Sequence, residues 1–162
     1  MIQEEQEMDI KDVLARRSDL STFIVHLTRD YNDHNAKENL KSIIRSWVIE
    51  ARSPYGSAKD KNVDSQKCVC FTETPLEHIH LLIKKIKGRS YEFKPYGVAI
   101  TKKLARKNKV NPVWYVEATD KQSSLMRSIN ELIQKTNGTF DSSTISKITP
   151  FIEQMGDWQD QR

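Results

Sequence analysis

The sequence of 162 residues is 37% hydrophobic and 30% charged, and its 26 basic and 22 acidic residues give a net charge of +4 at pH 7. This length and composition suit one folded domain and exclude disordered and fibrous proteins. No apolar run approaches the ~20 residues of a membrane-spanning helix, and the acidic start of the chain is unlike a signal peptide. Cys68 and Cys70 cannot easily form a disulfide with each other, which agrees with a reducing compartment. We therefore predict a single soluble domain over 1–162 that lies in the cytoplasm and has no membrane partner.

Residues 1–20 are expected to form a peripheral helical arm, and the first strand is predicted at 22–28. In this segment the apolar residues Phe23, Val25 and Leu27 occupy alternate positions, which is typical of a strand.

A long amphipathic helix is predicted at 36–51, because apolar residues recur there at helical spacing. Asp33 or Asn35 can cap its first turn, since short polar side chains accept hydrogen bonds from free amides. Trp47 is expected on the buried face of this helix. The polar, turn-rich stretch 52–67 then predicts an exposed loop, whose length favours mobility or function.

A second strand is predicted at 67–72, where β-branched, aromatic and cysteine residues gather. It leads into the sequence Thr-Pro-Leu-Glu at 74–77, which is typical of a capping box with proline at the first helical position. A helix is therefore predicted at 75–87, with Ile83 buried.

The second half of the chain predicts two further strands, at 97–101 and 112–116, joined by a short basic helical segment. Residues 120–157 are expected to be helical, with a kink at Pro150. Strands and helices are interspersed without a strict βαβ rhythm, which indicates an α+β fold. The predicted strands are expected to share one mixed sheet of about four or more strands, with amphipathic helices packed on it.

A metal site is considered because Cys68 and Cys70 are followed by His78 and His80, and thiolates and imidazoles are the usual ligands of zinc. Two residues that are two positions apart on a helix point about 200° away from each other, so only one histidine could join the cysteines. We therefore predict no metal site.

Two basic clusters are candidate nucleic-acid contacts, at 84–89 and at 102–109, and the second contains Lys102, Lys103 and Arg106. Side by side they would form an electropositive patch. The alternative, which we favour, is that they are solvated helix faces and last turns stabilised by the helix dipole. Nucleic-acid binding is therefore expected to be weak.

Four short motifs occur in order along residues 22–118. They are His26-Leu27-Thr28-Arg29, Cys70-Phe71-Thr72-Glu73-Thr74-Pro75-Leu76, Tyr96-Gly97-Val98-Ala99-Ile100 and Asn111-Pro112-Val113-Trp114-Tyr115-Val116. Together they resemble the AbiGi family of bacterial abortive-infection, or phage-resistance, proteins. The resemblance implies a phage-defence protein that works by binding, as an antitoxin-like or sensing component of a two-gene system. Its partner would be a cognate toxin or a phage component.

A strand bearing His26-x-Thr28, then a helix, then a strand ending in Phe71-Thr72 is distantly similar to the opening half of ADP-ribosyltransferase folds. This resemblance implies NAD as the cofactor and a cleft between His26 and Phe71-Thr72. In such a site His26 or Arg29 would anchor the dinucleotide, Thr28 would support it, and Phe71 with Thr72 would line the pocket. The residue-level alternative for His26 is a half-buried strand histidine hydrogen-bonded to a neighbour.

Two glutamates bear on the enzyme hypothesis. Glu73 is a ligand-binding candidate, but we favour a role in stabilising the start of the following helix. Transferases of this kind carry their catalytic glutamate on a late strand, whereas Glu153 lies in a helical pattern. No catalytic residue is therefore identified, and the chain would be a shortened or incomplete enzyme.

Three hypotheses stay open: a phage-defence protein that acts by binding, an ADP-ribosyltransferase-like enzyme that uses NAD, and a nucleic-acid-binding regulator. We favour the first.

Overall fold

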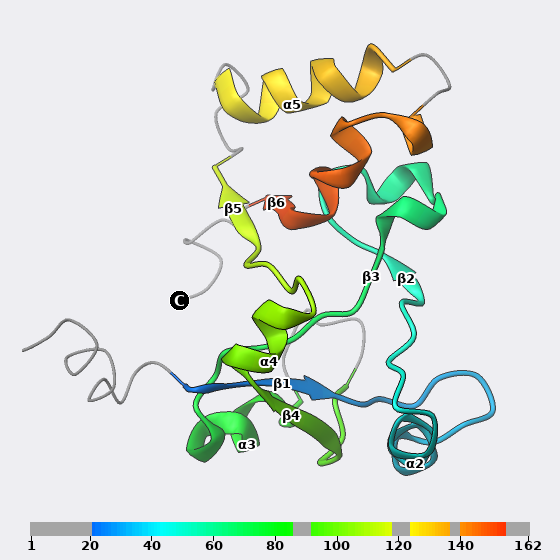
Figure 1. Cartoon of the computed structure of the whole chain (residues 1–162), viewed down its shortest axis with the longest axis vertical. Helices are drawn as coiled ribbons and strands as arrows, with labels where there is room; N and C mark the ends of the chain where they lie inside the picture. The colour runs from blue at the N-terminus through cyan, green and yellow to red at the C-terminus, as the bar shows by residue number, and fades with distance from the viewer. Residues whose placement is uncertain (1–20, 86–91, 118–123, 137–139, 155–162) are drawn as a thin grey trace, which may run out of the picture. The chain divides into compact units, whose positions relative to one another are not determined.

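The computed structural model describes residues 21–85, 92–117, 124–136 and 140–154, which Figure 1 colours by their position along the chain. The chain forms two compact units, each built from two separate segments. The first unit consists of Met1–Val48 and Cys70–Asn108, and the second consists of Ile49–Val69 and Lys109–Arg162. That residues 1–162 form a single domain stays a prediction, and the arm expected at 1–20 lies outside the described residues.

The fold mixes α and β, as predicted, but its strands form separate pairs. These pairs are β1 (Phe23–Leu27) with β4 (Gly97–Thr101), β2 (Ser53–Pro54) with β3 (Lys67–Cys68), and β5 (Trp114–Val116) with β6 (Ile152–Gln154). In the part of the chain that the structure describes, no sheet exceeds two strands, so the predicted mixed sheet of about four or more strands is wrong. One reason is that 67–72 is not one strand: Lys67–Cys68 pairs within the second unit, and Thr72 pairs within the first.

The sheet of the first unit confirms the strands predicted at 22–28 and 97–101. β1 and β4 are antiparallel and paired along their whole length. Ile24 and Val25 of β1 are buried. The backbone of Val25 also exchanges two hydrogen bonds of 2.9 Å with Thr72. The ladder is thereby extended by one residue, which fixes the segment around Thr72 against β1.

Helix α2 (Ala36–Ser46) begins as predicted and ends early. Asn35 is its N-cap, and Asn35 and Glu38 each accept a hydrogen bond from the other's backbone amide, which makes a capping box. The helix was expected to continue to residue 51, but Trp47 adopts a left-handed conformation with φ 56°. A left-handed residue ends a helix, because the chain turns away from the helix axis.

The helix predicted at 75–87 is much shorter than expected. Within the described residues it consists of a 3₁₀ turn, Leu76–His78, followed by the single turn of α3 (Ile79–Leu82). The predicted capping box is absent, because the hydroxyl of Thr74 lies 2.7 Å from that of Thr72 and is engaged there.

The burial predicted for Trp47 and Ile83 is wrong. Trp47 is 91% exposed, and Ile83 is only half-buried. Each is the residue at which its helix stops, so the helical spacing that predicted an inward position no longer applies there.

The second unit has its own core, to which parallel strands β5 and β6 and helix α5 (Ser124–Gln134) contribute. The core residues are Ala58, Val116, Ile129, Ile133, Phe140 and Ile152. The strand predicted at 112–116 is confirmed over Trp114–Val116.

The exposed loop predicted at 52–67 is wrong, because this segment carries structure and buried residues. It holds strand β2, the 3₁₀ turns Lys59–Lys61 and Asp64–Gln66, and the start of β3. Gly56 has φ +84°, and a Cβ atom there would lie 2.0 Å from the carbonyl oxygen of Thr149. Only glycine fits this close approach.

A buried polar network joins the same segment to the C-terminal part of the second unit. Gln66, Ser146 and Thr149 are all 0% exposed. The side-chain amide of Gln66 donates to the carbonyl oxygen of Ser146 at 2.8 Å, and its Oε1 accepts from the hydroxyl of Thr149 at 2.8 Å. Buried polar groups need such partners, because they have lost their hydrogen bonds to water.

The helical C-terminal part predicted at 120–157 is correct only for α5. After it come the 3₁₀ turns Phe140–Ser142, Ile145–Lys147 and Thr149–Phe151, and then strand β6. Glu153 therefore lies on a strand, where it is half-buried, and not in a helix. Among the described helices, none is long and apolar enough to cross a membrane.

Candidate functional site

The pairing of Val25 with Thr72 brings His26, the predicted ligand-binding residue on β1, next to the segment 70–73. The Nδ1 atom of His26 lies 2.9 Å from the carbonyl oxygen of Cys70. Because a carbonyl oxygen can only accept, this contact places a proton on Nδ1. The rings of His26 and Phe71 also contact each other, with centroids 5.7 Å apart. His26 thus has the contacts of a half-buried strand histidine that is hydrogen-bonded to a neighbour. Its role in ligand binding stays a prediction.

The hydroxyl groups of Thr28 and Thr72 are engaged inside the first unit. Thr28 is buried, and its Oγ1 lies 2.9 Å from the carbonyl oxygen of Ala36 and 3.1 Å from that of Tyr96. The Oγ1 of Thr72 accepts from the backbone amide of Thr74 at 3.2 Å. The Thr28 hydroxyl links β1 to two other segments, and the Thr72 hydroxyl holds the turn at Thr74, so both have little capacity left to bind a ligand.

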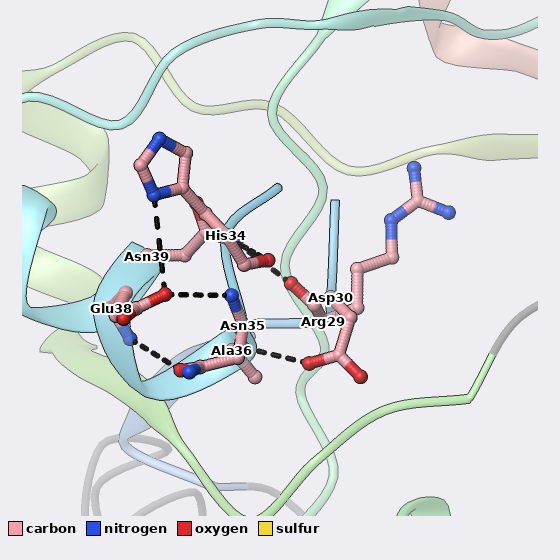
Figure 2. Close-up of polar contacts among 7 residues, drawn as sticks. All are labelled: Arg29, Asp30, His34, Asn35, Ala36, Glu38 and Asn39. Carbon is pink, nitrogen blue, oxygen red and sulfur yellow. Dashed lines mark hydrogen bonds and ion pairs between the residues drawn. The ribbon is translucent and has the colours of Figure 1, made fainter. Parts of the chain in front are cut away.

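The residues around the start of α2 form hydrogen bonds with one another (Figure 2). Oδ1 of Asp30 accepts from the amide of Ala36 at 2.8 Å, and Oδ1 of Asn35 accepts from that of Glu38 at 3.0 Å. The side chain of Asn39 donates to the carbonyl oxygen of Arg29 at 2.9 Å. Free amides at a helix start can bind phosphate, but here the protein's own side chains occupy those of Ala36 and Glu38.

The Arg29 guanidinium points away from this capping cluster (Figure 2) and acts on Cys70. Desolvation raises the pKa of the Cys70 thiol, although the residue as a whole is exposed, and the positive charge of Arg29 opposes that rise. The thiol is therefore mostly protonated at neutral pH and is a weak nucleophile.

Glu73 and Lys102, which the sequence placed in two different candidate sets, form one ion pair with an N–O distance of 2.9 Å. Lys102 opens the predicted short basic helix, α4 (Lys102–Lys107), whose first turn is capped by the hydroxyl of Thr101. Lys103 and Arg106 are exposed, and neither has an ion-pair partner among the described residues. Lys107, the last residue of α4, is exposed and unpaired in the same sense, so the basic surface of α4 consists mainly of Lys103, Arg106 and Lys107.

Among the described residues of the first unit, the most exposed large apolar side chains lie at the C-terminal end of α2. Trp47 is 91% exposed, Val48 60% and Ile44 57%. We call Ile44, Arg45, Trp47 and Val48 the α2 tip. The sequence did not predict this exposed group, because all the apolar residues of the helix were assigned to one buried face. A narrower buried face would have kept Leu40 and Ile43 and left Ile44 and Val48 exposed.

Residues 41–155 match the model of the family described as "Putative abortive phage resistance protein AbiGi, antitoxin". The chain belongs to the AbiGi family. No curated protein and no solved structure matches it.

The AbiGi match covers a different range from the expected 22–118. It begins at residue 41, so His26, Thr28 and Arg29 lie outside it, whereas the α2 tip and the segment 70–73 lie inside. It also extends through the second unit to residue 155. The AbiGi resemblance is therefore confirmed, and the resemblance to ADP-ribosyltransferases is not shown.

The cysteines and histidines of the AbiGi segment are not gathered into a metal site in the described residues, where no three possible ligands come together. Cys68 belongs to the second unit and Cys70 to the first. His80 Nδ1 lies 2.8 Å from the backbone carbonyl of Glu77 one turn earlier, so this contact also places a proton on Nδ1.

Proposed function

We propose that this AbiGi protein is the antitoxin of a two-gene phage-defence system and that it acts by binding its cognate toxin. The observation that carries the proposal is the match of residues 41–155 to a family described as an antitoxin of abortive phage resistance. An antitoxin requires a toxin, so the partner that this family implies is a protein.

The contacts in the first unit support a binding role more than an NAD-dependent one. His26 and Thr28 are hydrogen-bonded within the unit, and the amides of Ala36 and Glu38 at the start of α2 are occupied by side chains. In contrast, the large apolar side chains of the α2 tip are available to a partner. Exposed apolar surface of this kind marks protein interaction sites.

The test is to express the protein together with the product of the neighbouring gene. We expect that product alone to arrest growth, and co-expression to restore growth and yield a complex that co-elutes in size-exclusion chromatography. Restored growth without a complex would contradict the binding mechanism. A failure to restore growth would contradict the antitoxin proposal itself.

A further inference from the structure

We propose that the α2 tip is the surface through which this protein binds its toxin, and that the toxin presents an acidic rim around an apolar pocket. This inference rests on the proposed antitoxin function and adds the binding surface and the chemistry of the partner.

The apolar side chains of the α2 tip are exposed together. Three large apolar residues within five positions are more than half exposed, and Trp47 is 91% exposed. Single exposed apolar residues are normal on protein surfaces, but a contiguous group usually has a function. Tryptophan is also among the residues most enriched at the centres of interfaces.

Trp47 has a backbone conformation that is unusual for tryptophan. Its φ of 56° lies in the left-handed region, which glycine and asparagine adopt most easily at the end of a helix. Folding alone would favour glycine here, because a tryptophan that is 91% exposed gains almost nothing from burial. A bulky aromatic residue at this position is therefore better explained by a contact outside the chain.

Hydrogen bonds within the chain hold the α2 tip in one conformation. The amide of Trp47 donates to the carbonyl oxygen of Ile43 at 2.8 Å, and the amide of Val48 donates to the hydroxyl of Ser46 at 3.2 Å. That hydroxyl itself lies 2.9 Å from the carbonyl oxygen of Ser42. A surface held in its bound shape loses less entropy on association, which favours binding.

The charged residues beside the α2 tip indicate the chemistry of the partner. Lys37, Lys41 and Arg45 follow one another at intervals of four residues, so they lie along one exposed face of α2 that leads to the tip. None of the three has an ion-pair partner among the described residues. The acidic residue of this face, Glu38, is used in the capping box. An acidic partner surface would complement these cations, with Trp47 inserted in an apolar pocket.

The experiment uses the full chain and the toxin, with the dissociation constant measured by calorimetry and the thermal unfolding of the free chain followed in parallel. Trp47→Asn removes the indole but keeps a residue that tolerates the left-handed conformation. We expect the dissociation constant to rise at least about 30-fold, the size of a hot-spot effect, with a midpoint of unfolding that is equal to or slightly above that of the wild type, because asparagine adopts the left-handed conformation more easily. Arg45→Glu should weaken binding more at low salt than at high salt. Leu104→Asn, at an exposed leucine of α4, is the matched control and should bind as the wild type does.

Other results would overturn the inference in distinct ways. A complex that forms equally well with Trp47→Asn would place the toxin elsewhere while leaving the antitoxin function intact. A lower midpoint of unfolding for free Trp47→Asn would show that the indole is covered within the chain. A wild-type dimer that Trp47→Asn dissociates would make a second copy the occupant. If the wild type does not bind the toxin at all, the proposed function fails first.

Discussion

The ammonium group of Lys102 lies 2.9 Å from the carboxylate of Glu73, so the first cation of α4 is neutralised by a residue 29 positions earlier. Nucleic-acid binding through α4 should therefore depend mainly on Lys103, Arg106 and Lys107. We expect weak binding to DNA or RNA. Lys103→Ala and Arg106→Ala should each reduce the log–log salt slope by about 1, and Lys102→Ala by less. Fluorescence anisotropy over a salt series measures these slopes. Tight, sequence-specific binding at physiological salt would instead favour the regulator hypothesis.

His26 should matter more for stability than for nucleotide binding, because its ring contacts both Cys70 and Phe71. We expect His26→Ala to lower the free energy of unfolding by about 1–2 kcal/mol, the cost of a lost hydrogen bond and ring contact. His80→Ala, at an exposed histidine with only a local contact, should change it little. Calorimetry should detect no NAD binding by either variant or by the wild type. Binding by the wild type that His26→Ala abolishes would revive the ADP-ribosyltransferase hypothesis.

Gly56→Ala should destabilise the second unit strongly. The added Cβ would lie 2.0 Å from the carbonyl oxygen of Thr149, and φ of +84° is strained for alanine. We expect a loss of at least about 2 kcal/mol in the free energy of unfolding, measured by urea denaturation. Asn62→Gly is the contrasting variant, because Asn62 has φ 50° and glycine adopts that conformation easily. It should be neutral, and equal stability of both variants would contradict the close approach.

Gln66 and Thr149 should show coupled effects on stability. Gln66→Leu leaves the Thr149 hydroxyl without its main acceptor, and Thr149→Val leaves Oε1 of Gln66 without its donor. Each single variant should cost about 1–3 kcal/mol, the penalty for a buried polar group without a partner. The double variant should cost less than the sum, by at least about 0.5 kcal/mol. Strictly additive free energies from chemical denaturation would show that the two side chains do not interact.

Cys70 should react slowly with iodoacetamide, because its raised pKa keeps the thiolate fraction small at neutral pH. In a Cys68→Ser background, the rate should still rise with pH beyond the range in which an ordinary thiol levels off. Arg29→Ala removes the charge that lowers the pKa of Cys70, so it should move the rise of the reaction rate to higher pH. A move to lower pH would show that Arg29 does not stabilise the thiolate.

Local signals in the sequence predicted the parts of the fold that depend on neighbouring residues. Alternating apolar residues predicted β1, and the choice of Asp33 or Asn35 as the cap predicted where α2 begins. Periodicity failed at Trp47, where a left-handed residue ended the helix while apolar spacing continued. It also failed near the C-terminus, where Ile152 belongs to a strand that needs β5 as its partner.

The segment 52–67 was misread for a related reason. Its polar composition predicted exposure, yet Gln66 is fully buried because Ser146 and Thr149 supply its hydrogen bonds. Partners this distant in sequence leave no local signal. The candidate site shows the same limit. The rings of His26 and Phe71, which were expected to flank a cleft, contact each other, and the exposed α2 tip was assigned to the core.

The division of each unit into two segments sets an order of events on the ribosome. The first unit has all its residues once Asn108 has emerged, but 49–69 must wait for 109–162, which include Thr149 opposite Gly56. At about 5–20 residues per second, this wait lasts roughly a few seconds. During it, the first unit with its α2 tip can already be folded, so a nascent chain could meet its partner before translation ends.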